Sequence, residues 1–283
     1  MSNLESDEGD LTRKQRREQA REERKAAEQA AAAGDARRKR MTQLGGAVAV
    51  VVVAIVVILV ATGSGGGKKT PTLVNEKGGG QSTEVKKAVA EVKQEIDGIP
   101  QSGNVLGSPA APVTLQYFGD LECPICREFT TGALPALIQK WVKTGKLRVE
   151  YRNLETATRE PEVFTTQQTD ALAAGKQNKG WYFIELFYHL QGEEDSGYVT
   201  EKYLQGLASA TPGLNLAKWS SDRSDQTLQA KIATDTQEAN NNGFTGTPSF
   251  LIGKSGGALK KFEYSSLTDP SSFNEAIEKL LKA

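Results

Sequence analysis

The sequence predicts an α/β domain with a helical insertion, preceded by a single transmembrane helix and a flexible linker. A continuous apolar run near the N-terminus is long enough to cross a bilayer, and glycine-rich stretches follow it. Further along, the predicted order is strand, helix, strand, a long helical region, two strands and a helix. The first three of these elements predict a βαβ unit with a right-handed crossover.

The apolar run LGGAVAVVVVAIVVILVA lies within residues 41–63 and predicts a transmembrane anchor. At 1.5 Å per residue, a helix of about 18 residues spans roughly 27 Å, close to the thickness of the hydrocarbon core. A buried helix of a soluble domain and a cleaved signal peptide are the alternatives. The long charged segment before the run argues against a signal peptide, and whether the run is cleaved stays open.

Charge next to the apolar run sets its orientation. Residues 1–40 form a charged arm that ends in RRKR, so we expect the arm in the cytoplasm, as a disordered segment or a solvated helix. Binding of its basic residues to anionic lipid is the alternative role. Residues 64–81 predict a glycine-rich linker outside the cytoplasm. Residues 82–98 predict an amphipathic helix with Ser82 or Thr83 as its N-cap.

The predicted α/β domain covers residues 99–283. Its expected strands are VTLQYF, LRVEY, SFLIG and KKFEY, which are rich in β-branched and aromatic residues. We expect a helix between the first two strands, with a kink or break at Pro135. The helical insertion spans about 160–242, and the last helix is expected to have Pro270 at its first position.

Composition limits the classes of partner and cofactor. The chain has 35 basic and 35 acidic residues and a formal charge of zero, so it lacks the basic surplus of many nucleic-acid-binding domains. It contains one histidine and two cysteines, whereas a zinc site needs about four such ligands. We therefore expect no nucleic-acid partner, no metal and no cofactor, and we expect His189 to be a hydrogen-bonded residue on a helix face.

Both cysteines lie in the stretch GDLECPICREF. If VTLQYF is a strand and REFTT is helical, Cys123 lies at a helix N-terminus, where free N–H groups and the helix dipole favour a thiolate. Pro124 suits the first helical turn. Cys126 lies one turn later, within reach of Cys123 but more buried. This pattern predicts a redox-active disulfide with Cys123 as the nucleophile and Cys126 as the resolving thiol.

A chance pair of core cysteines and a structural disulfide are the two other interpretations. A disulfide that closes a loop with only two intervening residues constrains the unfolded chain little, which argues against a structural role. A domain outside the cytoplasm also lies where disulfides persist. The redox interpretation is therefore favoured.

The stretch GFTGTPSFLIG resembles a loop of the thioredoxin superfamily, in which a cis-proline precedes a strand and packs against the active-site cysteines. Pro248 occupies that place and follows Thr247, while a generic turn proline is the alternative. Proline is the residue for which a cis peptide bond costs little. The resemblance implies a thioredoxin-like fold with the helical insertion.

The two stretches VLGSPAAPVTLQYFGDLECPICREF and GFTGTPSFLIG resemble the DsbA-type thiol-disulfide oxidoreductases, in the membrane-anchored form of bacteria with one membrane. The resemblance implies that Cys123 exchanges with substrate sulfur, that Cys126 resolves, and that the backbone of Thr247 pairs with an extended substrate beside Pro248. It implies unfolded or partly folded exported proteins as substrates. It also implies a quinone-linked membrane thiol oxidase as the partner that reoxidises the cysteines.

Besides Pro124, which is a possible modulator of the thiols, three residues near the cysteines are candidate modulators or organisers. Ile125 stands where many strong oxidants of this family have histidine, so we expect less stabilisation of the thiolate. Glu122 opposes the thiolate if it is close, shuttles protons if its pKa is raised, or is a solvated loop carboxylate. Asp120 is expected to organise the turn rather than take part in the chemistry.

The leading functional prediction is a single-pass protein of the cell membrane whose extracytoplasmic domain oxidises exported proteins. A reductase or isomerase of the same fold is the second candidate. The third is a non-enzymatic tethered chaperone or binding module with a passive disulfide. The position of the thiols does not fix the direction of electron flow.

Overall fold

The computed structural model describes residue 73 and residues 81–283. The predicted charged arm (1–40), the predicted anchor (41–63) and nearly all of the predicted linker lie outside the described residues. Within the described part, no helix is both long and apolar enough to cross a bilayer. The α/β domain itself is described throughout.

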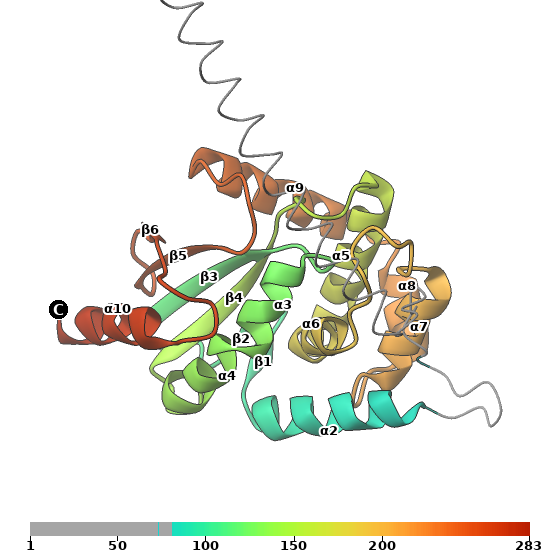
Figure 1. Cartoon of the computed structure of the whole chain (residues 1–283), viewed down its shortest axis with the longest axis horizontal. Coiled ribbons are helices and arrows are strands. Elements are labelled where there is room, and N and C mark those ends of the chain that lie inside the picture. The colour runs from blue at the N-terminus through green and yellow to red at the C-terminus, as the bar shows by residue number, and fades with distance from the viewer. Residues whose placement is uncertain (1–72, 74–80) are drawn as a thin grey trace, which may run out of the picture. The chain divides into compact units, whose positions relative to one another are not determined.

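A mixed six-stranded sheet forms the centre of the domain, with strand order β1-β2-β4-β3-β5-β6 (Figure 1). The strands are β1 (Gln101–Ser102), β2 (Val105–Leu106), β3 (Val113–Gly119), β4 (Leu147–Asn153), β5 (Ser249–Lys254) and β6 (Lys260–Phe262). β3 and β4 are parallel, as the βαβ pattern predicts, whereas the other neighbouring pairs are antiparallel. The short strands β1 and β2 were not predicted, because two residues are too few to show an alternating pattern.

Helices cover both faces of the sheet. They are α2 (Thr83–Ile96), α3 (Pro124–Thr131), α4 (Ala133–Leu137), a π-helical turn η1 (Ile138–Val142), α5 (Pro161–Gly175), α6 (Gly180–His189), α7 (Glu201–Ala210), α8 (Leu216–Asp222), α9 (Gln226–Asn241) and α10 (Ser271–Lys282). The helices α5 to α9 lie between β4 and β5, where the sequence predicts the insertion. Ser82 is the N-cap of α2, and its hydroxyl accepts a hydrogen bond from the Val85 N–H at 3.2 Å.

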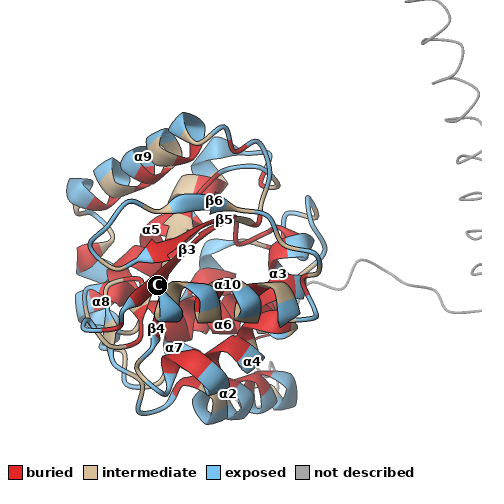
Figure 2. Ribbon diagram, turned by 90° about the vertical axis from the view of Figure 1, so that its left-hand side faces the viewer, coloured by how far each residue is buried: buried red, intermediate tan, exposed pale blue. Residues whose placement is uncertain are grey.

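Two apolar clusters hold the helices against the sheet. Tyr117 and Phe118 are neighbours in β3, so their side chains point to opposite faces, and both are fully buried. Tyr117 packs edge-on against Phe129 of α3, with ring centroids 5.0 Å apart. Phe118 packs against Phe244, which follows α9, at 5.2 Å. Figure 2 shows α9 on one side of the strands and α3, α6 and α10 on the other.

The helix after β3 breaks at Gly132, so the prediction of a break at Pro135 was wrong. A Cβ at Gly132 would lie 2.5 Å from the Glu128 carbonyl oxygen and 2.9 Å from that of Leu267. Pro135 lies in the first turn of α4, where the missing N–H leaves no intrahelical bond unmade. The start of α10 also differs by one residue from the prediction, because Pro270 is the N-cap of the helix rather than its first residue.

The substitution Gly132→Ala is expected to lower the free energy of unfolding by about 2 kcal/mol, because the new Cβ must displace two backbone segments. Urea unfolding of the full-length chain in mild detergent measures the change as a shift in midpoint. Gly246→Ala is the control, since an added Cβ there meets no atom within 4 Å. Equal midpoints for the two variants would contradict the steric account of the break.

Candidate active site

Both cysteines lie where β3 passes into α3. Cys123 is the N-cap of α3 and Pro124 is its first residue, as the sequence pattern predicts. The Cys123 N–H donates to the Asp120 carbonyl oxygen at 3.0 Å, which closes the turn between strand and helix. Cys126 lies one helical turn further on and is fully buried, whereas 5% of Cys123 is exposed. The first sulfur is therefore the one that a substrate can reach.

The two thiols differ in acid strength. A hydrogen bond from the Cys126 side chain lowers the pKa of Cys123 to about 6, and the Thr247 side chain and the N–H groups of Cys126 and Ile125 act in the same direction. Burial opposes this shift but does not cancel it. Burial raises the pKa of Cys126 well above its ordinary value. At neutral pH, Cys123 is therefore mostly a thiolate and Cys126 a thiol that donates to it.

The loop between α9 and β5 lies against the cysteines. Its Thr247–Pro248 peptide bond is cis, and Pro248 is buried. In its thiol form, Cys123 donates from Sγ to the Thr247 carbonyl oxygen at 3.5 Å. The Thr247 hydroxyl lies 2.5 Å from that of Thr156, on the loop after β4. The structure thus brings Thr247 and Pro248 beside two cysteines that are far from them in the sequence.

Asp120 organises the turn, as predicted. It is fully buried, and its Oδ1 accepts from the Glu122 N–H at 3.1 Å. Its Oδ2 accepts from three consecutive backbone N–H groups, those of Thr156 (3.0 Å), Ala157 (2.8 Å) and Thr158 (2.9 Å). One carboxylate therefore ties the turn before Cys123 to the loop after β4, which carries Thr156.

Two residues of the insertion support the active-site turn, and sequence reasoning missed both. Gln191 is buried, and its Nε2 donates to the carbonyl oxygens of Leu121 at 2.7 Å and Cys123 at 3.1 Å. The Tyr188 hydroxyl donates to the Asp120 carbonyl oxygen at 3.1 Å and accepts from the Tyr117 hydroxyl at 3.2 Å. Tyr188 lies within the apolar helix α6 and Gln191 lies two residues after its end, so the local sequence indicates only a core helix and its end.

Glu122 is buried, with 4% of its surface exposed, so the interpretation as a solvated loop carboxylate is wrong. Burial raises its pKa to about 7, a hydrogen bond with the Thr158 side chain opposes the shift, and the neighbouring Asp120 and Asp195 add to it. Glu122 is thus partly protonated near neutral pH. Ile125, by contrast, is 45% exposed on the first turn of α3.

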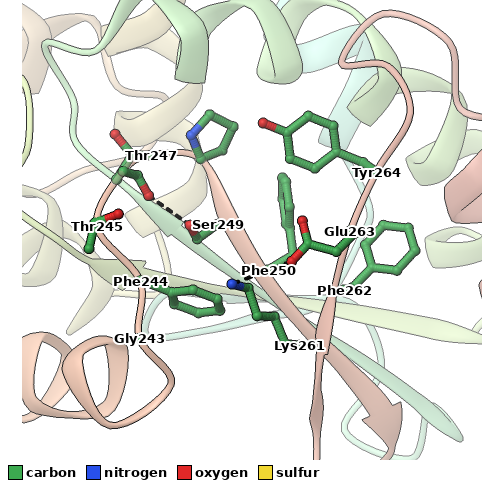
Figure 3. A pocket seen from close by; sticks show the side chains of 12 residues that line it. Gly243, Phe244, Thr245, Thr247, Ser249, Phe250, Lys261, Phe262, Glu263 and Tyr264 are labelled. Atoms are coloured by element: carbon green, nitrogen blue, oxygen red, sulfur yellow. Dashed lines mark hydrogen bonds and ion pairs between the residues drawn. The ribbon is translucent and has the colours of Figure 1, made fainter. Parts of the chain in front are cut away.

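An open cavity of about 460 Å³ lies beside the Thr247–Pro248 loop (Figure 3). Residues 243–250 line one wall and residues 261–264 line the other. The ring of Phe250 in the first wall and that of Tyr264 in the second wall meet edge-on, with centroids 5.5 Å apart. The second wall begins in β6, which is the edge of the sheet within the described residues, and continues into the segment that follows β6. The cavity therefore combines aromatic surface with backbone groups that suit an extended peptide.

His189 is the last residue of α6. The sequence predicted a hydrogen-bonded histidine on a helix face, but the side chain is only partly satisfied. Its Nε2 is buried and has no hydrogen-bond partner among the described residues. Its Nδ1 lies 3.5 Å from a carboxylate oxygen of Glu91 on α2. The side chain therefore belongs to the contact between α2 and α6.

Comparison with known proteins gives a consistent result. Residues 101–279 match the family model described as thioredoxin. The probable disulfide bond formation protein D of Bacillus anthracis is 25% identical over 178 residues, which cover 62% of this chain and 77% of the relative. The disulfide bond formation protein D of Bacillus subtilis is 22% identical over 178 residues, which cover 63% of this chain and 77% of the relative.

Solved structures share the fold. Oxidised BdbD from Bacillus subtilis superposes with a TM-score of 0.54 at 21% identity, covering 65% of this chain and 98% of that structure. The α-DsbA1 of Wolbachia pipientis gives a TM-score of 0.51 at 21% identity, covering 63% of this chain and 90% of that structure. The described domain thus has a thioredoxin-like α/β fold with inserted helices.

The variant Glu122→Gln is expected to lose part of the pH dependence of stability. The pKa of Glu122 is about 7 in the folded chain, and that of an unfolded glutamate is about 4.3. Its stabilising contribution is therefore fully present below about pH 4 and is lost as the pH rises through about 7. Urea midpoints measured from pH 4 to 8 should fall more steeply in the wild type than in Glu122→Gln.

Glu128→Gln, at an exposed carboxylate on α3, is the matched control and should keep the steeper fall of the wild type. If Glu122→Gln also keeps that fall, then the carboxyl of Glu122 does not titrate as its burial requires.

Proposed function

Because the chain belongs to the thioredoxin family and is a thiol-disulfide oxidoreductase of the DsbA type, we propose that Cys123 and Cys126 are its redox-active pair and that it oxidises exported proteins. The opposite shifts of the two thiol pKa values carry the proposal. A slightly exposed thiolate and a fully buried thiol one helical turn away are the two groups that disulfide exchange requires.

In the proposed reaction, the Cys123–Cys126 disulfide is the oxidant. A substrate thiolate attacks the Cys123 sulfur, the disulfide breaks, and Cys126 leaves and takes up a proton. A second substrate thiolate then attacks the substrate sulfur of this mixed disulfide, and Cys123 leaves as a thiolate. Two electrons have passed to the protein's cysteines, and the substrate holds a new disulfide. The low pKa of Cys123 makes it a good leaving group in the second step.

The same thiolate supports oxidation as the direction of the reaction. Stabilising the Cys123 thiolate stabilises the reduced form of the pair, and this makes the disulfide a stronger oxidant. The lowered pKa of Cys123 acts in this direction. The names of the Bacillus relatives refer to disulfide bond formation, which favours the same direction. A reductase or isomerase remains the second candidate, because its chemistry uses the same two sulfurs.

Substrate is proposed to bind in the cavity beside the Thr247–Pro248 loop. The backbone of Thr247 would pair with an extended segment, which unfolded or partly folded proteins offer and compact proteins do not. Ile125 presents an exposed apolar side chain next to Cys123, and the rings of Phe250 and Tyr264 lie in the cavity wall. These apolar contacts suit exposed core residues of an unfolded client.

We also propose that residues 41–63 anchor the domain in the cell membrane, with the domain outside the cytoplasm. The apolar run and its basic flank support this topology. An oxidase needs an acceptor for its two electrons, and a quinone-linked thiol oxidase in the same membrane is the proposed partner. The linker would let the cysteine pair reach both clients and that partner.

Equilibration of the full-length chain with glutathione redox buffers tests the function. Alkylation of reduced thiols reports the fraction reduced, and we expect a potential more positive than about −200 mV. Ile125→His should move it further in the positive direction, because a donor near Cys123 stabilises the thiolate, whereas the control Ile125→Leu should leave it unchanged. A potential near the value of about −270 mV known for thioredoxin would contradict the oxidase and favour the reductase.

Trapping distinguishes the enzyme from a binding module. Cys126→Ser should accumulate mixed disulfides with unfolded clients that contain a disulfide, because the Cys123 thiolate displaces one client sulfur and no second thiol resolves the product. Cys123→Ser should form none. Undiminished activity toward clients in Cys123→Ser would contradict the enzymatic proposal.

A further inference from the structure

Three side chains of the types that bind metal ions meet between α2 and α6. Glu95 comes from α2, while Glu185 and His189 lie one turn apart on α6. One ligand atom from each lies within 4.8 Å of the other two. Glu185 is 0% exposed, and neither of its oxygens has a hydrogen-bond partner within the described chain. Glu95 Oε1 and His189 Nε2 are also buried and unpartnered there.

An unpaired buried carboxylate is costly, so something must neutralise it. Lys143 is the cation whose charge favours ionisation of Glu95, and among residues 81–283 no corresponding cation acts on Glu185. A carboxylate with two bare oxygens, aimed at a second carboxylate and a bare imidazole nitrogen, needs either a proton or a cation. A divalent cation would satisfy all three side chains at once and would balance the two negative charges.

We propose that Glu95, Glu185 and His189 bind a divalent transition-metal ion of the zinc type. Two carboxylate oxygens and one imidazole nitrogen are ligands that suit zinc, and water would complete the coordination. Calcium and magnesium are disfavoured, because they take oxygen ligands and the imidazole offers nitrogen. The site was not expected from sequence, because the chain has only one histidine and the second carboxylate lies on another helix.

The geometry needs only small side-chain movements to fit the ion. His189 Nε2 lies 3.9 Å from Glu185 Oε2. Two ligands on one zinc ion lie about 3.3 Å apart when their bonds are about 2.0–2.1 Å long. The other imidazole nitrogen, Nδ1, faces Glu91 Oε2 at 3.5 Å. A carboxylate at that position holds the proton on Nδ1 and leaves the Nε2 lone pair for the metal.

The position of the cluster has a structural consequence. The His189 side chain is 17% exposed although its Nε2 is buried, so the cluster lies just below the surface. A bound ion would join α2 to the end of α6, which also carries Tyr188, the residue that donates to the Asp120 carbonyl in the active-site turn. The inference does not depend on the direction of thiol exchange.

Zinc titration of the full-length, untagged chain tests the site. The Cys123→Ser/Cys126→Ser background is used, because a reduced cysteine pair also binds zinc. After removal of metal with EDTA, calorimetry should give one site per chain, and Glu185→Gln should weaken it at least about 100-fold. Glu84→Gln, at an exposed carboxylate on α2, should bind zinc like the parent.

The single histidine provides a second readout. His189 gives the only imidazole signals in the chain, so NMR should show its Nε2 resonance shifting on zinc addition while Nδ1 stays protonated. This measurement stands even if Glu185→Gln does not fold. An unmoved imidazole, no saturable site below about 100 µM, or equal affinity in Glu185→Gln would overturn the proposal and indicate that Glu95 and Glu185 share a proton. Tighter binding of calcium than of zinc would overturn it as well.

Discussion

Thiol exchange at this site depends on one hydrogen bond, from the buried Cys126 thiol to the Cys123 sulfur. The two residues are one helical turn apart, yet burial raises the pKa of Cys126 while its hydrogen bond lowers that of Cys123. This contrast arises because Cys123 is the N-cap of α3 and is 5% exposed, whereas Cys126 lies inside the first turn of α3 and is fully buried. The fold therefore creates the difference between the two sulfurs, and the position of α3 on the sheet maintains it.

The inserted helices also stabilise the turn that carries Cys123, through hydrogen bonds from the end of α6. Gln191 and Tyr188, at the end of α6, donate to three carbonyl oxygens of the turn that carries Cys123. Asp120 ties the same turn to the loop after β4. The next residue after Tyr188 is His189, in the contact with α2. The C-terminal end of α6 therefore contacts both α2 and the turn that carries Cys123.

The sequence predicts those strands and helix starts that depend on residues close together in the chain. β-branched and aromatic residues predict β3 and β4, and the proline after Cys123 predicts the start of α3. The break at Gly132 was missed, because it depends on the close approach of a segment distant in sequence. The supporting roles of Tyr188 and Gln191 were missed for the same reason. The membrane anchor lies outside the described residues and stays a prediction.

The candidate site shows the same division. Cys123, Cys126 and the Thr247–Pro248 loop were selected from two short motifs, and the structure places them in contact. The protonation of Glu122 could not be predicted from the sequence, because burial is a property of the folded chain.

Thiolate absorbance at 240 nm, followed from pH 4 to 10 in the reduced full-length chain, tests the hydrogen bond from Cys126 to Cys123 most directly. We predict a first step near pH 6 that Cys123→Ser abolishes, and a first step near pH 9 would contradict the account.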